Sequence, residues 1–150
     1  MSQAHAKKFI EDYFARYSSI REFMDGVFER AKRSGYAETI LGRRRKIANA
    51  NSRNGNKRNQ ARRLAVNTVI QGSAADLIKV AMINIQRKID REKLGVKMIL
   101  QVHDELVFEV RAAEAEQHSQ WIRRLMREAI KLDVPLKVDV EYGPTWLGDK

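Results

Sequence analysis

The feature that most limits the possible folds of this chain is a polar triplet, His103-Asp104-Glu105, between two short apolar runs. The runs are Met98–Val102 and Leu106–Val110, and both are rich in Val and Leu. Runs of this length and composition are typical of β-strands. The pattern predicts a tight hairpin with the triplet at its tip. A carboxylate there can bind Mg²⁺, which takes oxygen ligands and often only one or two from protein. Taken alone, the triplet favours a solvated turn, because Asp is a common turn residue.

Positive charge is the strongest signal in the composition. The 150 residues include 29 Lys and Arg against 19 Asp and Glu, a net charge of +10. Such an excess favours a polyanionic partner, most often nucleic acid. No acidic residue occurs between Glu38 and Asp76. The basic residues of that acid-free interval are Arg43, Arg44, Arg45, Lys46, Arg53, Lys57, Arg58, Arg62 and Arg63.

The alternatives to nucleic acid are less favoured. A membrane surface would need an amphipathic helix with an aromatic apolar face, and none runs through the acid-free interval. A disordered basic tail is disfavoured because the interval is internal and periodic segments flank it. The chain has no cysteine, so it forms neither a disulfide nor a thiolate zinc site. No apolar run approaches membrane-spanning length and no signal peptide is evident, so we expect a cytoplasmic protein with no membrane partner.

The N-terminal half reads as helix, hairpin and loop. Helix is expected from about Gln3 to Arg33, with Ser2 as N-cap, Gly35 as C-cap and a possible break at Ser18-Ser19. Its apolar stripe consists of Phe9, Tyr13, Tyr17, Ile20, Phe23, Val27 and Ala31. A short hairpin should follow, formed by Tyr36–Ile40 and Lys46–Ile47 around Gly42-Arg43. The Asn-rich run Ala48–Asn59 predicts a mobile loop.

A long helix is expected from Lys57 to about Arg91, with a possible kink at Gly72 and Gly95 closing it. Its predicted buried side consists of Leu64, Val69, Ala74, Leu77, Ile78, Ala81, Met82 and Ile85. After the His103 hairpin, the spacing predicts a helix over Ala112–Lys131. The apolar face of that helix would consist of Ala115, His118, Trp121, Ile122, Leu125, Met126 and Ala129.

A last strand is expected over Leu136–Tyr142, followed by a short tail packed through Trp146 and Leu147. Leu136, Val138 and Val140 alternate along this strand and would point inward. The order of helices, hairpin, helix and strand predicts an α+β fold, with long helices packed on a small antiparallel sheet.

Three polar residues of the long helix form a candidate nucleic-acid face. Arg63, Asn67 and Gln71 are four residues apart, so a helix places them on one side. These side chains suit phosphates and base-edge acceptors. A solvated polar stripe, or hydrogen bonds from Asn67 and Gln71 to neighbouring backbone, explains the spacing about equally well. The small residues that follow, Gly72 to Ala75, would let the helix pack closely against a neighbour.

Four blocks of sequence together resemble the bacterial and phage family A DNA polymerases, the DNA polymerase I family. They are Gly35–Arg45, the helix carrying Arg63, Asn67 and Gln71–Asp76, the hairpin Gln101–Leu106, and Tyr142–Leu147. The resemblance covers nearly the whole chain. It implies one partial polymerase domain over residues 1–150. About residues 1–95 would be the helical, fingers-like part, and about 96–150 the part with the palm-type sheet and the metal-site hairpin.

The resemblance also implies roles for single residues. Asp104 would be one of two aspartates that bind the catalytic Mg²⁺ pair, with Glu105 in a supporting role and His103 close to the primer terminus. Two such ions, about 3.5–4 Å apart, serve nucleotidyl transfer. Asn67 and Gln71 would contact the primer–template duplex, and Arg63 would contact the template strand. Arg43, Arg44 and Arg45 would lie near the DNA backbone.

Other parts of the family pattern do not occur in these 150 residues. The motif with the other metal-binding aspartate and the helix that binds the incoming dNTP are both missing. We therefore expect that the chain alone does not polymerise DNA, and its status as an enzyme is open. Three hypotheses follow: part of a polymerase used in replication or repair, active with a complementary fragment; a DNA-binding module without chemistry; or an interaction protein that docks through an apolar surface.

Overall fold

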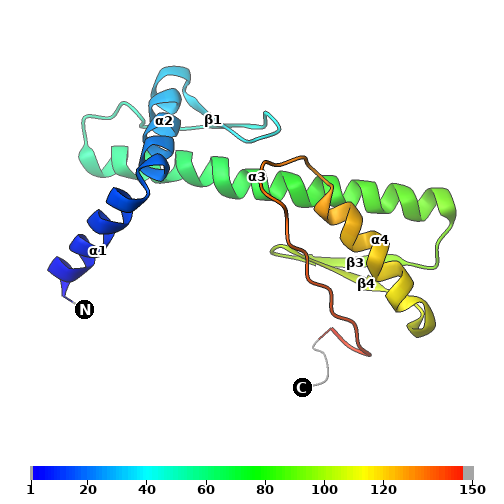
Figure 1. Cartoon of the computed structure of the whole chain (residues 1–150). Coiled ribbons are helices and arrows are strands. Elements are labelled where there is room, and N and C mark those ends of the chain that lie inside the picture. The colour runs from blue at the N-terminus through cyan, green and yellow to red at the C-terminus, as the bar shows by residue number, and fades with distance from the viewer. Residues whose placement is uncertain (1, 147–150) are drawn as a thin grey trace. The chain divides into compact units, whose positions relative to one another are not determined.

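The structure, a computed structural model, describes residues 2–146 and confirms an α+β fold (Figure 1). In this part of the chain, helices predominate and the strands form two separate two-stranded antiparallel sheets. The chain divides into two compact units, Met1–Ser73 and Ala74–Lys150. The longest helix, α3 (Gly55–Glu92), passes from the first unit into the second. Within residues 2–146, no helix has the length and apolar character needed to cross a membrane.

Two helices open the first unit. The predicted break occurs at Tyr17, which separates α1 (Gln3–Arg16) from α2 (Ser18–Ser34). Ser2 caps α1 as predicted, because its hydroxyl accepts the backbone N–H of His5 at 3.3 Å. Gly35 ends α2 with φ +79°, a left-handed conformation that glycine adopts without steric cost.

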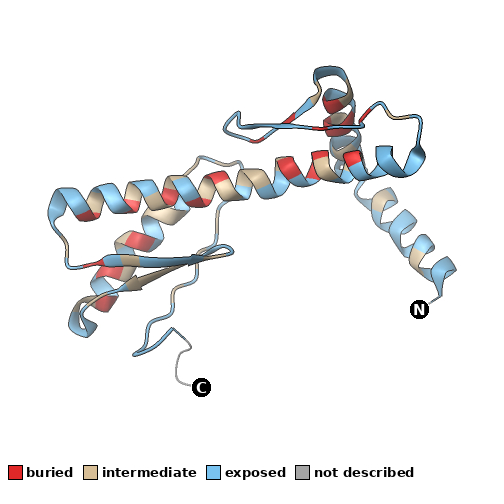
Figure 2. Ribbon diagram, turned by 180° about the vertical axis from the view of Figure 1, so that it is seen from behind, coloured by how far each residue is buried: buried red, intermediate tan, exposed pale blue. Residues whose placement is uncertain are grey.

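The apolar stripe of α1 and α2 is buried only at its C-terminal end (Figure 2). Val27, Phe28 and Ala31 lie in the core of the first unit. The earlier aromatic residues of the stripe are exposed, as Phe9 at 65% and Phe23 at 43% show. The helical spacing therefore predicted the stripe but not which part of it packs in this chain.

The predicted short hairpin follows α2, but its second strand begins at Arg44 and ends at Lys46, earlier than the predicted Lys46–Ile47. Strands β1 (Tyr36–Glu38) and β2 (Arg44–Lys46) are antiparallel, with Ala37 opposite Arg45. Ala37 is buried and joins the core that α2 and α3 share. The remaining core residues from the loop and α3 are Ile47, Ala50, Ala61, Ala65 and Val66.

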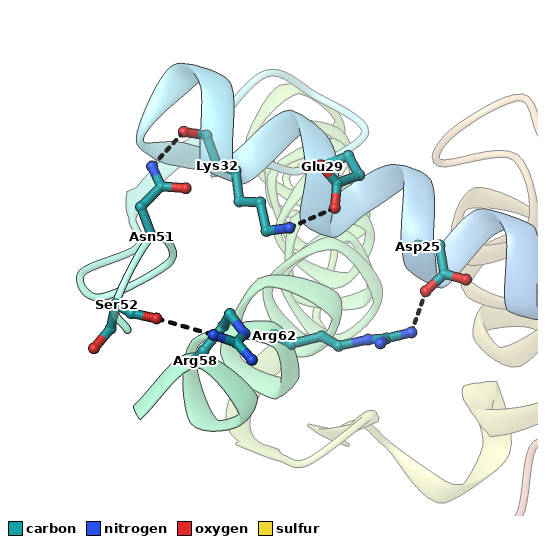
Figure 3. A network of polar contacts seen from close by, with 7 residues as sticks. All are labelled: Asp25, Glu29, Lys32, Asn51, Ser52, Arg58 and Arg62. Atoms are coloured by element: carbon teal, nitrogen blue, oxygen red, sulfur yellow. Dashed lines mark hydrogen bonds and ion pairs between the residues drawn. The ribbon is translucent and has the colours of Figure 1, made fainter. Parts of the chain in front are cut away.

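The Asn-rich loop is shorter than predicted, because α3 begins at Gly55 rather than Lys57. The Asn54 side chain accepts the backbone N–H groups of Asn56 and Lys57 at 3.0 and 3.2 Å, which satisfies two donors of the first helical turn. Hydrogen bonds attach the loop to both neighbouring helices (Figure 3). The Asn51 amide donates to the backbone carbonyl of Lys32, and the Arg58 guanidinium donates to that of Ser52.

Helix α3 is continuous through Gly72, the predicted kink position. A Cβ atom added there would lie 2.7 Å from the Cγ2 methyl of Thr39. Gly72 therefore allows the hairpin to approach α3 closely, as the run of small residues predicted. Ala74 is exposed, which corrects its placement on the buried side. The left-handed residue after the helix is Lys93, with φ +50°, rather than Gly95.

The second unit is built on the end of α3 and the predicted hairpin of β3 (Lys97–Val102) and β4 (Glu105–Glu109). A one-turn 3₁₀ helix, η1 (Ala112–Glu114), leads into α4 (Ala115–Arg127). The core of this unit consists of Ile85, Ile89, Val96 and Ile122. Helix α4 ends four residues before the predicted Lys131.

The predicted strand over Leu136–Tyr142 is wrong for the described structure. Leu136, Val138 and Val140 keep their alternating half-burial, but the segment pairs with no strand among residues 2–146. Alternation shows which side chains turn inward, whereas a strand also needs a hydrogen-bonding neighbour. Trp146 is 57% exposed, so it does not pack as predicted, and Leu147 lies outside the described residues.

Candidate nucleic-acid interface and metal site

Arg63, Asn67 and Gln71 form an exposed row on α3 in the first unit. All three side chains are exposed, whereas Ala65 and Thr68 on other sides of the helix are buried. The helix that the spacing required is therefore present, and the row faces solvent. Contact of this row with DNA stays a prediction.

The β1–β2 hairpin is fixed to α3 directly beside this row. The Arg43 guanidinium donates from Nη2 to the Gly72 carbonyl at 3.0 Å. The backbone N–H of Ile40 donates to the Ser73 hydroxyl at 2.9 Å, and that hydroxyl donates to the Val69 carbonyl. Arg43 is thus held at Gly72, the residue that follows Gln71 in the helix.

The other two predicted arginines of the hairpin differ in their surroundings. The Arg44 side chain donates from Nε to Glu38 on the opposite strand at 2.8 Å. This ion pair is largely exposed and stabilises by at most about 1 kcal/mol, but it offsets part of the charge of Arg44. Arg45 lies opposite Ala37 and is exposed. Of the two, Arg45 is the better placed to attract a phosphate.

Prediction from the sequence missed the contacts that orient the start of α3. The Arg62 guanidinium forms an ion pair with Asp25 of α2 (Figure 3). The adjacent Arg63 is exposed. The acid-free interval therefore contains basic residues that pair within the protein, such as Arg62, and basic residues exposed to solvent, such as Arg63. The partner that neutralises Arg62 is Asp25, which lies outside the interval, 37 positions earlier in the sequence.

His103 and Asp104 form the two-residue turn of the β3–β4 hairpin in the second unit, and Glu105 begins β4 opposite Val102. His103 has φ +52°, which is uncommon for a residue other than glycine. The Gln101 side chain stabilises this turn by donating to the His103 carbonyl at 2.7 Å. Non-glycine residues in such conformations often occur at functional sites, where the surrounding structure holds them in place.

The chemistry of the hairpin tip fits part of a magnesium site. Asp104 and Glu105 are exposed carboxylates on a short, hydrogen-bonded turn, and Mg²⁺ prefers such oxygen ligands. Within residues 2–146, no three His, Cys, Asp or Glu side chains gather closely enough to hold a metal ion. This hairpin would therefore provide one or two ligands, and the remaining ones would come from water, substrate phosphate or other protein groups.

Comparison with known proteins agrees with the family resemblance. The family model for DNA polymerase family A matches residues 1–148. DNA polymerase I of Geobacillus stearothermophilus is 45% identical over 150 residues, and that of Mycobacterium leprae is 47% identical over 146 residues. These alignments cover 100% and 97% of this chain but only 17% and 16% of the two relatives.

A solved structure shows the same similarity in three dimensions. The POL domain of Pol1 from M. smegmatis, in complex with DNA primer-template and dNTP, matches 97% of this chain with a TM-score of 0.91 and 45% identity. The match covers 26% of that domain. The chain belongs to DNA polymerase family A. It corresponds to a portion of the polymerase, about one sixth of the length of the curated relatives.

Proposed function

We propose that this chain contributes the DNA-contacting helix and one metal-binding hairpin to a family A DNA polymerase that performs template-directed nucleotidyl transfer. The observation that carries the proposal is the exposed row Arg63, Asn67 and Gln71, with Arg43 fixed beside it. The complex of the similar POL domain with primer-template and dNTP supports DNA as the partner. The bacterial relatives of this chain support a cytoplasmic location in a bacterium or a phage-infected cell.

The row would hold duplex DNA mainly without reading its sequence. Arg63 would bind backbone phosphate of the template strand. Asn67 and Gln71 have amide donors suited to the acceptors that every base pair presents in the minor groove. A contact of this kind depends on the geometry of the base pair and not on its sequence. A polymerase needs such a contact at the primer end, where it must accept every correct base pair.

The hairpin tip would act at the reacting end of the primer. Asp104 would provide a carboxylate ligand for catalytic Mg²⁺, Glu105 would support it, and His103 would lie close to the primer terminus. Mg²⁺ held there would supply positive charge to activate the primer hydroxyl and to stabilise the leaving pyrophosphate. We propose that the 150 residues alone do not extend a primer, because they include only one of the two aspartates and not the dNTP-binding helix.

Primer extension tests this assignment. The chain is assayed on a labelled primer–template with Mg²⁺ and dNTPs, with and without a fragment that supplies the other aspartate and the dNTP-binding helix. We expect extension only in the mixture and its loss with Asp104→Ala. Asp133→Ala, which removes another exposed carboxylate, is the matched control. Extension by the chain alone, or by the mixture with Asp104→Ala, would contradict the assignment.

A second candidate, a DNA-binding module without chemistry, is favoured by the exposed row itself, since binding through it requires no residue from elsewhere. Affinity should then fall steeply with salt and weaken with Arg63→Ala, with little dependence on DNA sequence. Arg123→Ala removes an exposed arginine from α4 and is the control. Salt-sensitive DNA binding without extension in any mixture would favour this candidate over the polymerase.

A further inference from the structure

The first unit contains a hollow that the duplex-binding row does not use. It lies between the C-terminal half of α2, the β1–β2 hairpin and Val69 of α3, and its volume is about 650 Å³. Sites for small ligands typically have volumes of about 300–1,000 Å³. The hollow is therefore large enough for a single nucleotide and far too small for a double helix.

The hollow carries net positive charge. Its lining includes Arg30, Arg33 and Arg44, and Glu38 is the one carboxylate among the described residues that line it. Glu38 pairs with Arg44 at 2.8 Å, so Arg30 and Arg33 supply the excess charge. Arginine suits a phosphate because its planar guanidinium donates two parallel hydrogen bonds.

Several backbone carbonyls at the end of α2 already accept hydrogen bonds within the protein. The carbonyl groups that end a helix are usually left unpaired and carry partial negative charge. Here the Ser34 hydroxyl shares its one proton between the carbonyls of Arg30 and Tyr36, at 2.9 and 3.0 Å, and accepts the Tyr36 N–H at 3.2 Å. Ser34 thus occupies polar groups at the edge of the hollow.

The remaining lining is suited to a base. Val27 and Ala37 are buried and Val69 is half-buried, so they offer an apolar surface. Tyr36 also lines the hollow and is 46% exposed, which leaves much of its ring accessible. Proteins that bind single strands combine an aromatic ring that stacks on a base with basic groups that follow the backbone.

We propose that this hollow binds one unpaired nucleotide of a DNA strand, with the base against Tyr36 and the phosphate on Arg30 and Arg33. The inference rests on the proposed function only in taking DNA as the partner. It adds a contact to single-stranded DNA that is separate from the duplex contact of the Arg63 row. In a primer–template, the unpaired nucleotides are those of the template overhang.

Fluorescence anisotropy with the whole chain tests the proposal on two labelled probes, a single-stranded oligothymidine and a blunt duplex. Tyr36→Ala should weaken binding of the single strand by about fivefold or more, since stacking on one aromatic side chain stabilises a base by about 1–3 kcal/mol. Tyr36→Phe keeps the ring and should bind like wild type. Arg33→Gln should also weaken single-strand binding, whereas Arg123→Gln should change it less.

Duplex binding separates the possible failures. We expect the Tyr36 and Arg33 variants to bind the duplex with near wild-type affinity. If Tyr36→Ala and Arg33→Gln leave single-strand affinity unchanged while Arg63→Ala still weakens duplex binding, the nucleotide site in the hollow is overturned and the proposed function stands. Absence of salt-sensitive binding to either probe would overturn the proposed function as well.

Direct evidence comes from photocrosslinking with a single strand that contains 5-iodouracil. Mass spectrometry should place the crosslink at Tyr36, and a crosslink confined to α3 would contradict the proposal. Circular dichroism of each variant guards against loss of fold. Arg33→Gln provides an independent test if Tyr36→Ala unfolds, because Arg33 is an exposed side chain.

Discussion

Replacement of Gly72 by alanine tests the packing that fixes the β1–β2 hairpin on α3. The added Cβ would lie 2.7 Å from the Thr39 methyl, whereas ordinary contacts of such atoms begin at about 3.4 Å. The hairpin would therefore have to retreat by about 0.7 Å. Two hydrogen bonds resist this movement, from Arg43 to the Gly72 carbonyl and from the Ile40 N–H to Ser73.

Two opposing effects set the size of the change. Alanine in place of glycine inside a helix stabilises it by about 1 kcal/mol. Overpacking of a closely packed contact typically costs about 1–3 kcal/mol. Because the hairpin is held at two points beside Gly72, we place the cost in the upper part of that range. We expect Gly72→Ala to lower the free energy of unfolding by about 1–2 kcal/mol.

Gly26 of α2 provides the matched control. A Cβ there would lie 3.5 Å from Nη1 of Arg30, an ordinary contact with the end of a flexible side chain. Gly26→Ala should therefore stabilise the protein by up to about 1 kcal/mol. The two substitutions are chemically identical and should shift urea denaturation, followed by circular dichroism, in opposite directions.

A second substitution can remove the predicted clash. Thr39→Ser deletes the Cγ2 methyl but keeps the hydroxyl that accepts the Arg43 backbone N–H at 3.1 Å. The double variant Gly72→Ala/Thr39→Ser should be more stable than Gly72→Ala alone, although Thr39→Ser by itself loses a buried methyl. The reasoning is refuted if Gly72→Ala is as stable as wild type, or if Thr39→Ser gives no recovery.

Three further predictions concern other parts of the chain. The side chain of Lys88, and then that of Arg91, hydrogen-bonds to Glu92 and lowers the pKa of its carboxyl below 4.5. The ionised Glu92 carboxylate therefore stabilises the fold above pH 4.5, and this stabilisation is lost as pH falls through its native pKa. Glu92→Gln should lower the Tm at pH 7 and should no longer do so in acid. Asn54→Ala removes the side chain that caps α3 and should cost about 0.5–2 kcal/mol, measured by thermal denaturation. His103→Gly should change the free energy of unfolding by less than about 1 kcal/mol, because relief of the positive φ offsets the greater freedom of glycine in the unfolded chain. A similar Tm with reduced primer extension in the complemented mixture would separate a role of His103 in activity from one in folding.

The parts of the fold that the sequence predicted are those determined by neighbouring residues. The Ser2 cap, the Gly35 end of α2 and the His103 hairpin each depend on a few adjacent side chains, and the structure has all three. The exposed row on α3 followed from helical spacing alone. Burial of Phe9 and pairing of the Leu136–Tyr142 segment depend on surfaces distant in sequence. Periodicity shows which side chains share an apolar face, but it does not show which other part of the chain packs against that face.

The packing of the small residues Gly72 and Ser73 sets the direction in which the exposed row points. A row of side chains four apart has a defined direction only if the helix cannot rotate about its axis. Successive residues of a helix are about 100° apart, so Gly72 faces a different side from Gln71. The Thr39 methyl against Gly72 and the Ile40 bond to Ser73 hold that side on the hairpin. Rotation is thereby blocked, and Gln71 is directed to solvent. We therefore expect Gly72→Ala to weaken duplex DNA binding although Gly72 touches no ligand. Unchanged affinity in a variant with the predicted loss of stability would show that the direction of the row is fixed elsewhere along α3.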